Sequence, residues 1–107
     1  MENDKMQKIQ FFQESLQTIL MQKQAFQMEL NETVAALGEV EKSKDDVYKV
    51  VGQIMIKVAK ESTVEDLKRK EKILSTQLKK LEEQENKLSS EVKKLRDELI
   101  KGSKAQK

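Results

Sequence analysis

Two long stretches of the sequence repeat apolar residues at spacings of three and four, the heptad pattern lettered a to g in which a and d are apolar. In the first stretch, residues 4–42, eight of ten a and d positions are apolar, and in the second, residues 63–101, nine of eleven are. Neither stretch contains a proline. The pattern predicts two helices that each bury one narrow stripe against a partner helix, as in a coiled coil.

The composition agrees with stripes and not with a globular core. Only 36% of the residues are apolar against 37% that are charged, and four residues are aromatic in a chain of 107. Low hydrophobicity also permits disorder of the free chain, but a net charge of only +2 and the regular heptads favour an ordered coiled coil.

The similar lengths of the two stretches predict that they fold back on each other. In an antiparallel pairing whose facing residue numbers add to 104, the polar a and d residues gather in three layers. Thr33 then faces Glu71, and Lys23 lies within reach of Glu85. Other registers scatter these residues, and buried polar groups are tolerated best when paired, so we expect this register.

Charge favours the same arrangement. Residues 1–46 carry 5 basic and 9 acidic residues, whereas residues 67–107 carry 13 basic and 7 acidic ones. The two arms attract each other, although salt screening limits this to a preference for orientation.

The segment between the helices, residues 46–60, is rich in β-branched residues and has no helical period. Gly52-Gln53 at its centre fits a two-residue type II′ turn, which would place Val51 opposite Ile54 in a β-hairpin. After it, Ser62-x-x-Glu65 has the form of a capping box and predicts the start of the second helix.

The hairpin is expected to be an assembly element, because a lone two-stranded sheet is marginally stable and this one has apolar residues on both faces. Further hairpins could add to its edges and form an oligomeric β-barrel platform. The alternative is that the hairpin packs on the base of its own coiled coil. The candidate oligomerisation residues are Val47, Tyr48, Val50, Val51, Gly52, Ile54, Met55, Ile56 and Val58.

These features together resemble the prefoldin family, and specifically its β-class subunits of archaeal type. The resemblance spans nearly the whole chain and is most specific in Asp46-Val47-Tyr48-Lys49-Val50-Val51-Gly52 and Ile54-Met55-Ile56-Lys57. The α-class has two hairpins, and this chain has room for one. Gln53 stands where the family commonly has proline.

The resemblance implies one prefoldin-like domain over residues 1–107, with a flexible tail at 102–107. It implies a cytoplasmic hexamer of two α-class and four β-class subunits. Such a complex holds unfolded proteins at the coiled-coil tips without ATP and delivers them to a group II chaperonin.

The tips would contain both chain termini, where fraying helices offer an adaptable apolar surface. The candidate client-binding residues are Met6, Ile9, Phe11, Phe12, Leu16, Leu95, Leu99 and Ile100. Several of these occupy a or d positions and also have an ordinary packing role. Phe11 at c and Ile100 at b lie outside the a and d stripe and are the more specific signal.

Other functions have little support in the sequence. Without His or Cys, a transition-metal site and a His-based catalytic triad are excluded, and no phosphate-binding glycine loop is present. We expect no enzymatic activity and no cofactor. The basic second stretch suggests nucleic-acid binding, but glutamates interrupt its lysines and no aromatic residues interleave with them, so we expect no nucleic-acid binding. We also expect no membrane binding, because the chain has neither a wide apolar face nor a cationic amphipathic helix. A coiled-coil scaffold or tether that binds no client is the main alternative.

Overall fold

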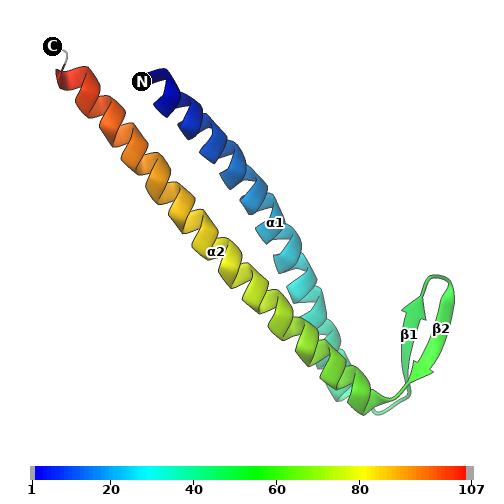
Figure 1. Cartoon of the computed structure of the whole chain (residues 1–107). Coiled ribbons are helices and arrows are strands. Elements are labelled where there is room, and N and C mark those ends of the chain that lie inside the picture. The colour runs from blue at the N-terminus through cyan, green and yellow to red at the C-terminus, as the bar shows by residue number, and fades with distance from the viewer. Residues whose placement is uncertain (1, 106–107) are drawn as a thin grey trace. The chain divides into compact units, whose positions relative to one another are not determined.

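The computed structural model describes residues 2–105, with side chains for residues 3–102. Helix α1 (Glu2–Lys42) is followed by strands β1 (Val47–Val51) and β2 (Ile54–Val58) and by helix α2 (Lys60–Ala105), as Figure 1 shows. Two long helices joined by a short β-hairpin are the fold class that the sequence predicts. Residues 106 and 107 of the predicted tail lie outside the described residues.

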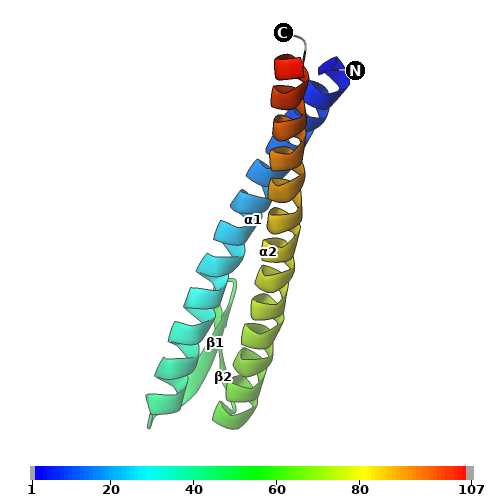
Figure 2. The ribbon, with the colours of Figure 1, turned by 90° about the vertical axis from the view of Figure 1, so that its left-hand side faces the viewer.

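The chain divides into two compact units, and both helices contribute to each. The terminal unit combines residues up to 25 with residues from 78 onward, and the hairpin unit comprises residues 26–77. Within each unit the segments of α1 and α2 lie side by side and run in opposite directions (Figures 1 and 2). In the terminal unit the first turn of α1 and the last turn of α2 lie at the same end (Figure 1).

The core of each unit is the stripe of a and d side chains, here called the seam. All 21 predicted seam positions, ten in α1 and eleven in α2, are buried or half-buried. Within the described residues no large side chain is fully buried, so the seam is a thin core. The most deeply buried seam residues are Ile19, Thr33, Leu74, Leu78, Leu81 and Val92.

Three of the polar seam residues, Lys23, Glu85 and Thr33, have hydrogen-bond partners. Lys23 Nζ lies 3.1 Å from Glu85 Oε1 in the terminal unit, which confirms the contact that the antiparallel register predicts. Thr33 is only 3% exposed, and its hydroxyl donates to the carbonyl of Glu29 at 2.8 Å instead of requiring a partner on the facing helix. A buried hydroxyl satisfied within its own helix avoids the cost of an unpaired polar group.

The start of α2 differs from the prediction. The helix begins at Lys60, and the first helical hydrogen bond runs from the Thr63 N–H to the Ala59 carbonyl at 3.1 Å. The hydroxyls of Ser62 and Thr63 also donate to that carbonyl, so Ser62 lies inside the first turn and the predicted capping box is wrong. At its other end, α2 continues to Ala105, beyond the predicted end at residue 101.

Lys60 connects the two helices at the base of the hairpin. Its Nζ donates to the carbonyls of Glu41 and Ser43, at 3.2 and 2.8 Å. The Glu41 carbonyl belongs to the last turn of α1 and Ser43 directly follows the helix, where unpaired C=O groups carry partial negative charge. An early start of α2 is therefore favoured by a contact that joins residues far apart in sequence.

The hairpin has the predicted register and turn. Val51 pairs with Ile54 and Val47 with Val58 in an antiparallel sheet. Gly52 has a φ of +61°, and no non-glycine residue with positive φ occurs in the described chain, so Gln53 does not adopt the left-handed conformation. A positive φ at the first turn residue alone matches type II′ and not type I′.

We predict opposite effects of alanine at two glycines. Gly52→Ala places a side chain in the left-handed region and should destabilise the protein by about 1–2 kcal/mol. Gly38 lies in α1 with no other atom near an added Cβ, so Gly38→Ala should stabilise by about 0.5–1 kcal/mol. Urea unfolding followed by circular dichroism measures both changes, and equal effects would contradict the assigned turn.

We also predict that the Lys23–Glu85 ion pair contributes to stability. Lys23→Glu would bring two carboxylates together in a half-buried layer and should cost about 1 kcal/mol in urea unfolding. The exchanged pair Lys23→Glu with Glu85→Lys should recover most of that loss. If the double variant is as unstable as the sum of its single variants, the two residues do not interact.

Candidate functional site

The hairpin carries a set of exposed apolar side chains on both of its faces. Six of them are between 48% and 66% exposed, which is unusual for residues of this size in strands. We call them the hairpin surface: Tyr48, Val50, Val51, Ile54, Met55 and Ile56. The remaining predicted strand residues, Val47 and Val58, are half-buried at the base of the hairpin.

The hairpin does not pack on its own coiled coil. Its apolar side chains would be buried in that arrangement, and they are exposed. In the described residues β1 and β2 form a sheet of two strands, so both strands are edges with unpaired backbone N–H and C=O groups. An ion pair between Lys57 Nζ and Asp46 Oδ2, at 3.4 Å, lies near the base.

The second group of predicted site residues lies in the terminal unit. Met6, Phe11 and Ile100 are 60%, 64% and 53% exposed. The rings of Phe11 and Phe12 meet edge to face with their centroids 6.0 Å apart, so Phe11 partly rests on a seam residue. The other predicted residues are half-buried in the seam: Ile9, Phe12, Leu16, Leu95 and Leu99.

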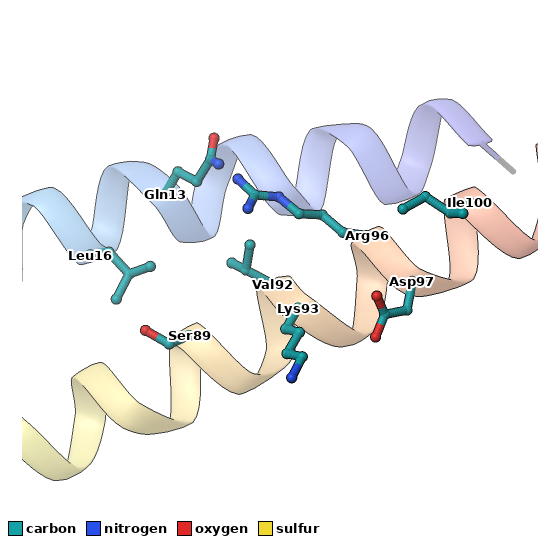
Figure 3. A pocket seen from close by; sticks show the side chains of 8 residues that line it. All are labelled: Gln13, Leu16, Ser89, Val92, Lys93, Arg96, Asp97 and Ile100. Atoms are coloured by element: carbon teal, nitrogen blue, oxygen red, sulfur yellow. The ribbon is translucent and has the colours of Figure 1, made fainter.

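Among the shallow grooves on the terminal unit, two include predicted tip residues. The first, of about 590 Å³, is lined only by uncharged residues; we call it the amide groove. Its lining consists of Asn3, Met6, Gln7, Ile9, Gln10, Gln13 and Leu99. The second, of about 370 Å³, is the arginine groove (Figure 3). Its lining consists of Gln13, Leu16, Ser89, Val92, Lys93, Arg96, Asp97 and Ile100.

The grooves bring together some of the predicted residues and add polar ones. Met6, Ile9 and Leu99 share the amide groove, while Leu16 and Ile100 share the arginine groove. Three other predicted residues, Phe11, Phe12 and Leu95, line neither of these two grooves. The prediction missed the polar lining residues, although the heptad positions of Gln13 and Arg96, both at e beside the seam, signal that they face each other.

In the part of the chain that the structure describes, no group of His, Cys, Asp or Glu residues could hold a metal ion. Among the same residues, no helix is long and apolar enough to cross a membrane.

Known proteins share the sequence and the fold of this chain. The family model described as Prefoldin subunit matches residues 3–106. The chain belongs to the prefoldin family. It resembles proteins named Prefoldin subunit beta, among them one from Pyrococcus furiosus that is 40% identical over 75 residues, which cover 68% of this chain. Another, from Pyrobaculum neutrophilum, is 36% identical over 91 residues, which cover 83% of this chain and 72% of the relative.

One solved structure agrees with the resemblance to β-class subunits. The crystal structure of the prefoldin beta subunit from Thermococcus strain KS-1 matches with a TM-score of 0.87 and 34% identity, covering 94% of this chain and 90% of that one. The prefoldin beta2 subunit of the same strain matches with a TM-score of 0.70, and at 22% identity it shows the fold alone. The alignment with the Pyrococcus furiosus relative spans 64% of that relative's length.

Proposed function

We propose that this chain is a subunit of an ATP-independent chaperone that holds unfolded polypeptides at the coiled-coil tips and delivers them to a group II chaperonin. The observation that carries the proposal is that large apolar side chains are exposed on the hairpin and near the free ends of the helices, while the seam is buried or half-buried. Further exposed apolar side chains are spread along the helices, at Leu20, Met21, Met28, Val34 and Ile73. Membership of the prefoldin family supports it. The proposal includes no catalytic step and no cofactor.

The hairpin surface serves assembly in this proposal. Burial of six large apolar side chains and pairing of two free strand edges both require strands from other subunits. The partners are α-class prefoldin subunits and further copies of this chain, in a hexamer of two α-class and four β-class subunits. Residues 1–107 then act as one prefoldin-like domain in the cytoplasm, as the family resemblance implies.

The terminal unit serves client binding. Met6, Phe11 and Ile100 are exposed and adjoin half-buried seam residues that a fraying helix end can release. Each contact with an unfolded chain is weak, and several tips that act together add avidity. Methionine suits such contacts because its flexible, polarizable side chain adapts to varied surfaces.

We predict that a charge on the hairpin surface prevents assembly. Val51 and Ile54 are exposed in the single chain, so Val51→Lys or Ile54→Glu should leave the helices folded and lower the sedimentation mass, because burying an unpaired charge in a strand interface is costly. Val34→Lys is the matched control, since Val34 is 47% exposed on α1. An unchanged mass for the hairpin variants would remove the hairpin as the interface.

We predict that the exposed apolar side chains of the tips are needed to hold an unfolded protein. The assembled complex, without nucleotide, should suppress the aggregation of a chemically unfolded protein on dilution, measured by light scattering. Ile100→Ser combined with Phe11→Ser should weaken suppression several-fold, because both side chains are exposed apolar contacts. Deletion of residues 1–12 and 95–107 should abolish suppression without dissociating the complex.

Ile73→Ser provides the matched control for Ile100→Ser. Ile73 lies on the same helix in the hairpin unit and is 52% exposed, against 53% for Ile100. This variant should retain full suppression. Full activity of the tip variants would remove the tips from the mechanism, and no suppression by an assembled complex would favour the alternative of a scaffold or tether without client binding.

A further inference from the structure

The arginine groove differs from a simple apolar contact surface. Its apolar part consists of Leu16 from α1 and of Val92 and Ile100 from α2. Val92 is only 5% exposed, whereas Ile100 is 53% exposed, so the groove has a buried floor and an open apolar side. At about 370 Å³ it falls at the lower end of the range of roughly 300–1,000 Å³ found for ligand pockets, enough for a few side chains of a bound segment.

The cationic side chain of Arg96 lies over this floor. The Arg96 side chain extends from α2 toward α1, between Gln13 and Ile100, whereas Lys93 points away from α1 (Figure 3). Within the described residues, no ion pair joins Arg96 or Lys93 to a carboxylate. A guanidinium that lies beside apolar side chains and has no hydrogen-bond or ion-pair partner among the described residues is suited to a carboxylate from another molecule.

The acidic side chains nearby do not neutralise this cation. Asp97 lines the groove, but its carboxylate points away from α1, on the side of Lys93 (Figure 3). Glu98 is paired with Lys5 at 3.4 Å, which ties that carboxylate to α1. In the arginine groove, the Arg96 guanidinium therefore lies over the apolar floor, whereas the carboxylate of Asp97 points away from it.

The amide groove gives an internal comparison. It is lined by amide side chains and by Met6, Ile9 and Leu99, and none of its lining residues is charged. Both grooves include Gln13, so they adjoin each other on the terminal unit. A bound polypeptide thus meets a neutral surface in one groove and a cationic one in the next.

We propose that the arginine groove selects unfolded segments in which an aspartate or glutamate lies next to apolar residues, with Arg96 as the residue that determines this preference. The inference rests on the proposed function, since it names the class of client segment that the tips prefer. The apolar side chains of the segment contact Leu16, Val92 and Ile100, and its carboxylate accepts hydrogen bonds from the guanidinium of Arg96. A lysine at the same place in the segment is repelled.

The test uses the full chain in its assembled complex and a short fluorescent peptide of leucine, phenylalanine and serine with one central position that is Glu, Gln or Lys. Binding is measured by fluorescence anisotropy. Because exposed ion pairs contribute modestly, the Glu peptide should bind about two- to fivefold more tightly than the Lys peptide at low salt, with the Gln peptide between them. The difference should fade at about 500 mM salt, where the screening length is only a few ångströms.

Variants of Arg96 test whether this residue causes the preference for the Glu peptide. Arg96→Met keeps the apolar stem and removes the charge, so it should equalise the three peptides, and Arg96→Glu should reverse their order. Lys87→Gln, at an exposed lysine of α2 that lines neither groove, is the matched control and should keep the wild-type order.

The outcomes separate this inference from the proposed function. Equal binding of the three peptides by the unmodified complex, or a preference that survives Arg96→Met, would overturn the inference and leave client binding intact. Failure of the unmodified complex to bind any of the peptides would overturn client binding at the tips, and the inference with it.

Discussion

The pairing of one narrow stripe on α1 with one narrow stripe on α2 is the interaction on which the rest of this molecule depends. Within the described residues no large side chain is fully buried, so no single contact dominates stability. The free energy comes instead from many half-buried layers repeated along two helices of 41 and 46 residues. A helix of this kind has little reason to stay folded without its partner, because its apolar residues are concentrated on one face.

Because the two stripes are narrow, apolar side chains outside the seam stay exposed. The helices use their apolar residues on each other, and they have no wide face that could cover a β-hairpin as well. The hairpin therefore exposes apolar side chains on both faces, and the ends of the helices expose Met6, Phe11 and Ile100. In a prefoldin-family chain these two exposed groups support different proposed roles, assembly for the hairpin and client binding for the tips.

The polar residues of the seam contribute more to arrangement than to net stability. Lys23 and Glu85 are partly removed from water, and the loss of hydration offsets much of their attraction. Their value is positional, because the two side chains meet across the seam in the observed antiparallel arrangement. The ion pairs between Lys70 and Glu29 in the hairpin unit, at 3.2 Å, and between Lys5 and Glu98 in the terminal unit also join α1 to α2.

Some features were missed because they depend on contacts that local patterns do not contain. The Ser62-x-x-Glu65 pattern has the right spacing for a capping box, yet α2 begins at Lys60, whose ammonium group binds carbonyls at the end of α1. That contact spans 17 and 19 residues of sequence. The arginine groove was missed for a related reason, since a charged residue at position e is usually solvated, and its relation to Leu16 depends on how the two helices meet.

The sequence by itself determined the two helices, their antiparallel register, the hairpin and its turn. These follow from periodicity, from the positions of polar residues in the heptads and from the one glycine that a type II′ turn requires. Only the tertiary structure decided where α2 begins and how Arg96 lies over an apolar floor. Those outcomes depend on side chains from two helices meeting in space, and a one-dimensional pattern does not specify the direction in which each side chain points.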